Sequence, residues 1–458
     1  MKLKVKAKLD SGFIPMSLVV REMREATKDD GQDIIIAAER NKGYITTYKT
    51  RIFRDGTGHD EENNKFVDRI AKTLLWVAGG YKLIIAGSEQ VADYLRRTYC
   101  YGGTRDFDVR FMERVYEAKF EVIETTLENA PKDKSSASPV GRHLDGCRIG
   151  FDAGGSDRKV SAVVNGETVY SEEVVWFPKL NSDPAYHYEG ILSAMKTAAS
   201  HMPRVDAIGV SSAGVYIDNK IMVASLFIKV PDEDFEKRVK NMYIDVAREI
   251  GENIPIEVAN DGDVTALAGA MSLDDNGILG IAMGTSEAAG YVDMDGNITG
   301  WLNELAFAPV DYNPESMLDE WSGDYGCGVK YFSQDAVIKL APAAGIHLDE
   351  SLSPAEKLKV VQGLMAEGDE RARAIYETIG TYFGYTIAYY CEFYDIKQVL
   401  IMGRVTSDEG GVVLLDMAKR ALEAEFPHLA EKVKLNIPDE KARRVGQSVA
   451  AASLPKIG

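Results

Sequence analysis

An apolar strand-like segment that ends in two adjacent glycines constrains this chain more than any other feature. Residues 147–155 read CRIGFDAGG, and Ser156 follows them directly. A second strand-like run, residues 160–164, comes soon after, so the glycines lie at a turn between two strands. Glycine lets the backbone approach a ligand closely, and successive N–H groups in such a turn form an anion-binding concavity. The turn is compatible with phosphate binding, although a Gly-rich hairpin without function has the same pattern.

The residues of this turn are the candidate contacts of a nucleotide. Gly154, Gly155 and Ser156 offer backbone N–H groups and a hydroxyl to phosphate oxygens. A carboxylate cannot favour an anion directly, but it can hold a divalent metal that accompanies a nucleotide. Asp152 is therefore the candidate ligand of Mg²⁺.

Length and charge exclude several classes of protein. The chain has 458 residues, 45% of them hydrophobic, which is enough for two or three domains with substantial cores. Its net charge of −18 argues against nonspecific binding to nucleic acid, which requires clustered Lys and Arg. No apolar run is long enough to span a bilayer, and the N-terminal residues do not resemble a signal peptide. We expect a protein that binds neither membranes nor nucleic acid.

The four cysteines indicate the compartment. Cys100, Cys147, Cys327 and Cys391 are far apart and show no pairing pattern. In a chain of this size such cysteines are typical of reduced thiols in the cytosol, so a cytoplasmic location is predicted. The histidines show no metal-ligand spacing, and we expect His187 at the surface or behind the site.

The order of predicted elements divides the chain. Residues 1–130 read as an α/β unit, and the polar, Pro- and Ser-containing segment 131–146 is the best linker. The strand–strand–helix–strand order of residues 1–130 occurs again after the linker, without the paired glycines in the first copy. Residues 1–130 are therefore interpreted as a degenerate duplicate, with chance similarity of α/β units as the alternative. Residues 147–260 with a C-terminal helix at about 440–458 form a predicted first lobe, and residues 261–439 a second lobe.

Two further strand ends carry polar residues. An apolar strand at residues 278–282 leads into Gly284, Thr285 and Ser286, a second Gly-hydroxyl turn that could grip a triphosphate together with the first. Another apolar strand, residues 399–402, stops at Gly403. A long helical region is predicted from about 354 to 394.

Asp261 lies at a strand-to-helix junction, and two roles are open for it. Asp and Asn are favoured helix N-caps, worth about 1 kcal/mol, so the residue could be purely structural. Alternatively, its carboxylate could accept the proton of a sugar hydroxyl that attacks a γ-phosphate, which typically contributes about 10²–10⁴ in rate.

Five segments within residues 147–458 resemble, in order, motifs of the ROK family (repressors, open reading frames and kinases) of sugar kinases. They read DAGGS, ANDGDVTALAGA, MGTSEAAGYVDMDGNITG, VLIMGRVTS and VGQSVAAASL. The resemblance implies an α/β protein with the two-lobed actin/hexokinase-like (ribonuclease H-like) fold, here with an additional N-terminal unit. It implies Asp261 as catalytic base and Mg-ATP as phosphate donor. The implied sugar contacts are Asn260, Glu304 and Gly214, and the implied nucleotide contacts are Asp152, Gly154, Gly155, Ser156, Gly284, Thr285, Ser286 and Gly403.

Three departures from the family pattern accompany the resemblance. The family segment AGExGH reads LNELAF here, so Glu304 keeps its place while Phe307 replaces the histidine. The family zinc motif CxCGxxGC is reduced at residues 320–327 to Cys327, and one thiolate cannot make a structural zinc site, so no zinc is predicted. Glu287 follows the second Gly-hydroxyl turn directly, where a charged carboxylate would repel a nucleotide.

The sequence thus supports an ATP-dependent hexose kinase with Asp261 as general base. The alternative is a catalytically inactive ROK-like sugar sensor or regulatory protein. The identity of the sugar and of its reacting hydroxyl, the retention of ATP turnover, the role of residues 1–130 and the oligomeric state, for which a homodimer is one option, stay open.

Overall fold

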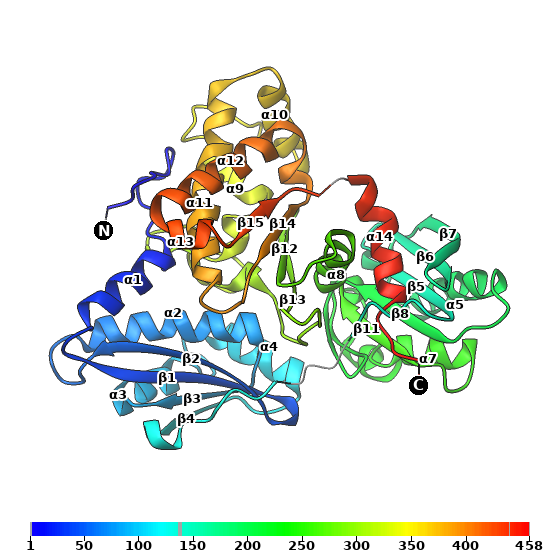
Figure 1. The fold of residues 1–458 in the computed structure, drawn as a ribbon, viewed down its shortest axis with the longest axis horizontal. Helices are drawn as coiled ribbons and strands as arrows, with labels where there is room; N and C mark the ends of the chain where they lie inside the picture. Colours follow the sequence, from blue (N-terminus) through cyan, green and yellow to red (C-terminus); the bar gives the residue numbers. More distant parts are fainter. Residues whose placement is uncertain (1, 136–139, 439, 458) are drawn as a thin grey trace. The chain divides into compact units, whose positions relative to one another are not determined.

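The computed structural model describes residues 2–135, 140–438 and 440–457, with the side chains of 440–445 excepted (Figure 1). Residues 136–139 of the predicted linker lie outside the described residues. The chain forms two compact units: unit 1 comprises residues 1–136, 281–289 and 300–437, and unit 2 comprises residues 137–280, 290–299 and 438–458. Residues 1–130, predicted as a separate unit, thus share a compact unit with residues 300–437.

Unit 2 is built on a five-stranded sheet with the order β11-β8-β5-β6-β7. The central strand β5 pairs in parallel with β8, which pairs in parallel with β11, while β5, β6 and β7 are successively antiparallel. The strands are β5 (Cys147–Ala153), β6 (Asp157–Val164), β7 (Glu167–Val175), β8 (Ala207–Ser212) and β11 (Ile256–Asn260). The strand-like runs predicted at residues 147–155 and 160–164 correspond to β5 and β6, whose apolar residues suit strands with buried faces, whereas β7 was not predicted.

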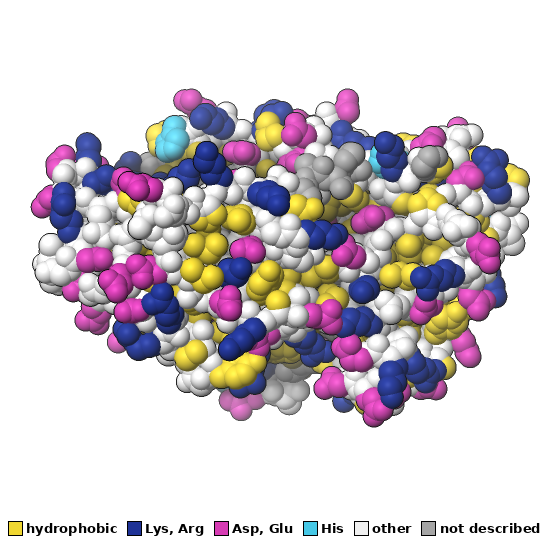
Figure 2. Space-filling model, turned by 90° about the horizontal axis from the view of Figure 1, so that it is seen from below, with side chains coloured by type: hydrophobic (Ala, Val, Ile, Leu, Met, Phe, Trp, Pro, Cys, Tyr) yellow, Lys and Arg dark blue, Asp and Glu magenta, His cyan; other side chains and the backbone are white. Residues whose placement is uncertain are grey.

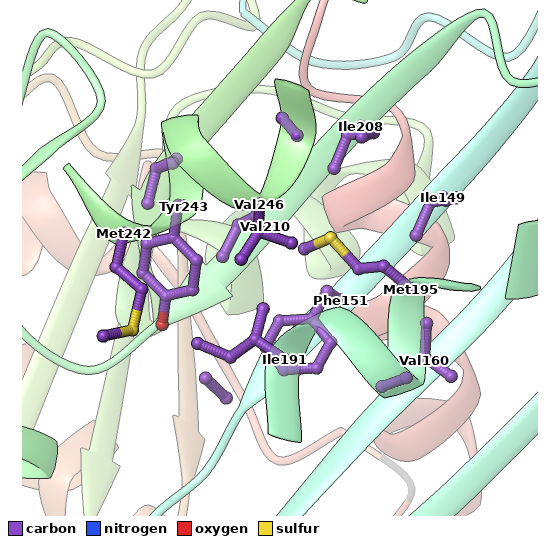
Figure 3. Close-up of a cluster of buried hydrophobic side chains, with 14 of the residues drawn as sticks. Ile149, Phe151, Val160, Ile191, Met195, Ile208, Val210, Met242, Tyr243 and Val246 are labelled. Carbon is purple, nitrogen blue, oxygen red and sulfur yellow. The ribbon is translucent and has the colours of Figure 1, made fainter. Parts of the chain in front are cut away.

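The side chains of β5 and β8 alternate between the two faces of this sheet. On one face, Ile149 and Phe151 pack with Met195 of α5 (Pro184–Ser200) and Val246 of α7 (Met242–Ile250) in a buried cluster (Figure 3). The other elements of unit 2 are η3 (Pro178–Leu180), β9 (Val215–Ile217), β10 (Lys220–Val223), η4 (Ser225–Phe227), α6 (Asp232–Asp234), η5 (Phe235–Val239), α8 (Asp261–Leu273) and α14 (Glu440–Ala452).

Helix α14 lies directly on the opposite face of the sheet because two strand residues there are glycines. A Cβ placed on Gly150 would lie 1.9 Å from the carbonyl oxygen of Ser448. A Cβ on Gly209 would lie 1.7 Å from the carbonyl oxygen of Ala451. Any side chain at either position would push α14 off the sheet.

Unit 1 contains a four-stranded sheet from the N-terminal part of the chain, with the order β2-β1-β3-β4. β1 is antiparallel to both β2 and β3, and β3 is parallel to β4. In unit 2 the corresponding strands β5 and β8 are parallel, so this difference argues against the interpretation of residues 1–130 as a duplicated half. The elements are α1 (Met16–Ala26), β1 (Gly31–Arg40), η1 (Asn41–Gly43), β2 (Tyr44–Phe53), α2 (Asp60–Ala78), β3 (Lys82–Ala86), α3 (Glu89–Thr98), α4 (Asp106–Tyr116), β4 (Glu121–Thr125) and η2 (Leu127–Asn129).

A second four-stranded sheet, with the order β13-β12-β14-β15, belongs largely to unit 1, since the division between the units falls within β12 and β13. The predicted helical region 354–394 is two helices, because Gly368 adopts a left-handed conformation (φ +79°) that ends the first of them. The elements are β12 (Ile278–Met283), β13 (Glu287–Val292), η6 (Leu305–Phe307), η7 (Gly328–Lys330), α9 (Gln334–Leu340), α10 (Pro354–Ala366), α11 (Glu370–Tyr390), β14 (Gln398–Met402), η8 (Arg404–Thr406), α12 (Asp408–Glu425), α13 (Pro427–Ala430) and β15 (Lys434–Asn436).

A buried charge cluster joins the N-terminal part of unit 1 to the segment 320–327. The Asp324 carboxylate accepts ion pairs from Arg69 at 2.7 Å, Lys72 at 2.8 Å and Arg105 at 2.7 Å. All four side chains are buried. Burial alone would raise the pKa of Asp324, but the three cations hold it well below its usual range.

The surface and the helices of the described residues bear on the expected absence of nucleic-acid and membrane binding. On the face drawn in Figure 2, Lys and Arg side chains are interspersed with Asp and Glu, so its described residues form no continuous basic surface. Among the described residues, no helix has both the length and the apolar character that crossing a bilayer demands.

The contact between α14 and the sheet generates a stability prediction. The change Gly209→Ala places a methyl group against the Ala451 carbonyl, and we expect a destabilisation of about 1–3 kcal/mol or more from overpacking. Gly363→Ala in α10 is the control, since a Cβ there meets nothing within 4 Å and alanine favours a helix by about 1 kcal/mol. Urea unfolding measures both, and equal midpoints for the two variants would contradict the packing argument.

The charge cluster generates a second prediction. Asp324→Asn removes the shared carboxylate: Arg105 keeps Asp68 and Lys72 keeps Asp108, but the buried Arg69 loses its ion-pair partner among the described residues, which we expect to cost about 3–5 kcal/mol. The same change at Asp33, whose ion pair with Arg51 is exposed, should cost at most about 1 kcal/mol.

The pH dependence of this effect follows from the lowered pKa of Asp324. The stabilisation is fully present above the pKa of an unfolded Asp, about 3.9, and is lost only as the pH falls through the lower folded value. The difference in unfolding free energy between wild type and Asp324→Asn should thus be constant from pH 5 to pH 7. A difference that shrinks over that range would contradict the assignment.

Candidate functional site

The carboxyl ends of three parallel strands bring the predicted residues of unit 2 to one edge of its sheet. In the strand register, Asp152 of β5 lies beside Ser211 of β8, and Ser212 lies beside Asn260 of β11. Asp261 follows Asn260 as the first residue of α8. In open α/β sheets ligands bind outside the carboxyl ends of the strands, so this edge is the candidate site.

Asp152 lies almost buried at the centre of this edge. One of its carboxylate oxygens accepts a hydrogen bond of 2.8 Å from the Ser211 hydroxyl, and the other accepts none from the described residues. Burial raises the pKa of Asp152 to about 6, and the nearby Asp261 charge adds to this increase, while Ser211 and Lys159 act in the opposite direction. A single carboxylate with an available oxygen fits Mg²⁺ held mainly by phosphate oxygens and water.

Asn260, rather than Asp261, caps helix α8. The Asn260 side-chain oxygen accepts the Gly262 N–H at 2.7 Å, and its amide donates to the Gly214 carbonyl at 2.8 Å. Gly214 has φ +141° and lies against the backbone of Val223, so a Cβ there would clash. Asn260 and Gly214 are therefore tied into the strand ends, and the interpretation of Asp261 as the N-cap is wrong.

The Asp261 carboxylate has no comparable structural role. One carboxylate oxygen lies 3.0 Å from the Gly262 nitrogen, whose N–H also donates to the Asn260 side chain. The other oxygen accepts no hydrogen bond from another described residue. Burial raises the pKa of Asp261 above its ordinary value, while the Gly262 N–H and the charge of Lys179 oppose this increase. A carboxylate with a raised pKa and an unoccupied oxygen is suited to accept a proton.

The paired glycines form the turn between β5 and β6. The Trp176 indole N–H donates to the Gly154 carbonyl at 2.8 Å, and the Trp176 main-chain N–H donates to the Ser156 carbonyl at 3.1 Å. A Cβ on Gly154 would lie 2.7 Å from the Asp157 carbonyl oxygen, and one on Gly155 would lie 3.1 Å from Lys179 Cε. The close backbone oxygen of Asp157, not a left-handed backbone, therefore favours glycine at position 154, whereas at position 155 the only near atoms belong to the flexible end of the Lys179 side chain.

The second Gly-hydroxyl turn and Gly403 lie together in unit 1. Gly403 adopts φ +100°, and a Cβ there would lie 2.4 Å from the carbonyl oxygen of Met283, the residue before Gly284. The Gly284 N–H donates to the Ser286 carbonyl at 3.0 Å. Thr285 and Ser286 are exposed, and their hydroxyls bond to no described residue.

Glu287 points away from solvent. Its side chain is buried, and neither carboxylate oxygen has a hydrogen-bond partner among the described residues. Burial, with the Glu304 charge as a smaller cause, raises the pKa of Glu287 well above its usual range. The Glu287 carboxyl is buried and does not project to solvent beside the exposed Thr285 and Ser286, so the conflict seen in the sequence is reduced.

The loop around Glu304 packs on the N-terminal part of unit 1. The Glu304 main-chain N–H donates to the Trp76 carbonyl at 2.9 Å. The Phe307 ring lies 4.5 Å from Trp76 and 5.3 Å from Phe107 between ring centroids. Phe307, which replaces a histidine of the family pattern, is thus part of an aromatic cluster.

The surroundings of Cys327 do not fit a zinc ion. Burial raises the pKa of the Cys327 thiol to about 11, so it is neutral at pH 7. The neighbouring carboxylate of Asp324 is already paired with Arg69, Lys72 and Arg105. A structural zinc site needs about four N or S ligands, and among the described residues no group of three or more His, Cys, Asp and Glu side chains is placed to hold a metal ion.

Three residues around the candidate site were not expected from the sequence. Ser211, Gln447 and Lys179 were not predicted, although Gln447 donates to Ser211 at 3.2 Å and Ser211 holds Asp152. Polar residues at the end of an apolar strand were the available signal for Ser211. His187, expected at the surface or behind the site, is fully buried with its ring facing main-chain carbonyl groups, so the surface alternative is wrong.

Comparisons with known proteins identify the fold. No protein-family model and no curated protein matches the sequence. Among solved structures, a ROK hexokinase from Thermus thermophilus is similar with a TM-score of 0.50 and 18% identity, over 67% of this chain and 97% of the hexokinase. A ROK family transcriptional regulator, a homologue of the E. coli MLC protein, has a TM-score of 0.51 and 18% identity, over 68% of this chain and 79% of the regulator.

Structural similarity at such low sequence identity establishes the fold but not the activity, which is left to be proposed. The predicted α/β, actin/hexokinase-like class is confirmed, and the chain has a ROK-like sugar kinase fold.

Proposed function

We propose that the protein is an ATP-dependent sugar kinase that transfers the γ-phosphate of ATP to a hexose hydroxyl in the cytoplasm. The observation that carries the proposal is the position of the Asp261 carboxylate at the same carboxyl edge of the sheet as Asp152, with strand β8 between them, and with one oxygen that accepts no hydrogen bond from another described residue. The hexokinase among the similar structures supports the same reaction class.

Asp261 acts as the general base. The hydroxyl proton of the sugar moves to the Asp261 carboxylate as the sugar oxygen forms its bond to the γ-phosphorus. The bond from that phosphorus to the β,γ-bridging oxygen breaks, and ADP leaves with the electron pair. The proton on Asp261 is then released to solvent, so the carboxylate is restored.

Each unit has its own set of proposed nucleotide contacts. In unit 2, the main-chain N–H groups at Gly154 and Gly155 and the Ser156 hydroxyl contact phosphate oxygens, and Asp152 holds Mg²⁺. The magnesium ion supplies charge neutralisation at the β- and γ-phosphates. In unit 1, the proposed nucleotide contacts are Gly284, Thr285, Ser286 and Gly403, with two exposed hydroxyls among them.

The sugar contacts are assigned to Asn260, Glu304 and Gly214. The Asn260 amide has two N–H bonds, and the Gly214 carbonyl accepts only one of them, so one donor remains for a sugar hydroxyl. Gly214 acts through this hydrogen bond, because it positions the Asn260 amide. Glu304 supplies a carboxylate that can accept from sugar hydroxyls.

A sugar-binding regulatory protein without turnover is the second candidate. Phe307 favours it, because an aromatic cluster occupies the place where the family pattern has a sugar-contacting histidine. The ROK regulator among the similar structures is consistent with this alternative. A coupled ADP-release assay with a panel of hexoses separates the candidates: sugar-dependent ADP release supports the kinase, and sugar-induced thermal stabilisation without ADP release supports the sensor.

The change Asp261→Asn tests the general base. Turnover should fall at least about 10²-fold, while the sugar-induced increase in melting temperature is retained, because the amide keeps the shape but cannot accept the proton. Asp274→Asn, at the exposed C-terminal end of the same helix, is the matched control and should leave turnover unchanged. Turnover of Asp261→Asn close to that of wild type would remove Asp261 from this role.

The raised pKa of Asp152 predicts a pH-dependent requirement for Mg²⁺. Below about pH 6 the carboxyl is protonated and cannot hold the metal, whereas above it the ligand is charged. Calorimetric titration with Mg²⁺ and a non-hydrolysable ATP analogue should show affinity weakening roughly tenfold per pH unit below pH 6. In Asp152→Asn the affinity should be weak throughout and depend less steeply on pH, because only the terminal phosphate of the ligand, whose second pKa is about 6, still titrates. A wild-type dependence no steeper than that of Asp152→Asn would refute the assignment.

A further inference from the structure

We infer that the Lys179 ammonium group binds the terminal phosphates of the nucleotide at the Gly154–Gly155 turn. The inference rests on the proposed function, which it deepens by adding a cation to the phosphate site. Lys179 is exposed on the short helix η3, which follows the edge strand β7.

The geometry of the turn places Lys179 against it. A Cβ on Gly155 would lie 3.1 Å from Lys179 Cε and 3.3 Å from Lys179 Nζ. The ammonium group therefore covers the place where a larger residue at position 155 would project. A phosphate seated on the N–H groups of this turn would lie within reach of it.

The main chain that carries Lys179 is fixed to the turn on one side. Trp176 donates from its indole to the Gly154 carbonyl and from its main chain to the Ser156 carbonyl, so it spans the two ends of the turn. Its side chain is buried in the core of unit 2. Because Lys179 is only three residues further along the chain, its position relative to Gly155 is well defined.

His187 fixes the other side. Its Nε2 atom lies 3.0 Å from the Pro178 carbonyl oxygen and 3.3 Å from that of Leu226, and its Nδ1 atom lies 3.2 Å from the Asp183 carbonyl oxygen. The ring is fully buried in α5. The residue just before Lys179 is therefore held to the body of unit 2, while the Lys179 side chain stays available.

Lys179 also has no close polar partner in the described part of the chain. It forms no hydrogen bond or ion pair with the described residues, whereas the neighbouring Lys159 lies 3.5 Å from Asp157 and 3.9 Å from Glu173. Its charge acts on Asp261, whose pKa it lowers against the larger effect of burial. The Lys179 ammonium lies next to Gly155 and its charge acts on Asp261. It is therefore close to the position that the transferred phosphoryl group must take when Asp261 accepts the sugar proton.

Charge balance at the turn gives the reason for such a cation. Asp152, Asp157 and Asp261 all lie near the turn, and their negative charges would oppose an arriving triphosphate. Mg²⁺ offsets part of this repulsion, and an unpaired lysine offsets more. Lysine is suited to this task because its ammonium is a point charge that tolerates movement of the phosphate.

Binding of inorganic tripolyphosphate with Mg²⁺, followed by calorimetry, tests the inference without requiring turnover. Lys179→Gln should weaken this binding at least tenfold, and Lys179→Arg should stay within about threefold of wild type, since the positive charge is kept. Lys196→Gln removes the same charge from an exposed position on α5 and should bind as wild type does. Equal urea midpoints for the variants would confirm that folding is unaffected.

Turnover provides the second readout. Lys179→Gln should raise the KM for ATP at least tenfold while the KM for the sugar is unchanged, a split that general structural damage would not produce. Tripolyphosphate binding of Lys179→Gln equal to that of wild type overturns the inference, as does an equal loss in Lys196→Gln. If wild type binds neither tripolyphosphate nor a non-hydrolysable ATP analogue, the inference is also overturned.

The two proposals fail in different ways. If wild type binds tripolyphosphate through Lys179 but releases no ADP with any hexose, the kinase proposal fails and the Lys179 site stands. If wild type is an active kinase and Lys179→Gln keeps the wild-type KM for ATP, the inference fails and the kinase proposal stands.

Discussion

The parallel pairing of β5, β8 and β11 is the constraint on which the candidate site depends. Its register sets Asp152 beside Ser211 and Ser212 beside Asn260, so residues separated by more than a hundred positions in the sequence end at one edge. The pairing is stabilised from both faces, by the apolar cluster under α5 and α7 and by α14 on the glycine-bearing face. A shift of one residue in any of these strands would turn the site residues toward the opposite face.

At this edge, negative charge is concentrated rather than avoided. Two carboxylates of this edge, Asp152 and Asp261, both have raised pKa values because burial disfavours their charged forms. Such an arrangement is costly for stability, and it is typical of sites where a metal or a proton is exchanged. The exposed Lys179 and the N–H groups of the glycine turn are the complementary positive features, so the edge can accept an anion together with a cation.

The sequence predicted the strands and their polar ends better than the contacts between them. Apolar runs that stop at Asp152, Asn260 and Gly284 are visible without a structure, and all three end strands as expected. Strand direction is not encoded in such runs, which is why the antiparallel pairing of β1 with β3 was missed. Lys179 was not predicted because an exposed lysine in a short connection has no periodic pattern. Its position depends on hydrogen bonds of Trp176 and His187 to main-chain carbonyl groups, which the sequence does not reveal.

The cluster around Asp324 has a consequence for how the protein matures. In proteins whose loop is held by a bound transition metal, the loop becomes ordered only when the ion binds. Removal of the ion by a chelator or oxidation of the thiolates disorders the loop again. Here the loop at 320–327 is fastened by the guanidinium and ammonium groups of Arg69, Lys72 and Arg105, which are part of the chain itself. These groups come from the N-terminal residues of the chain, so order in the loop depends on contacts that a chain without those residues cannot make.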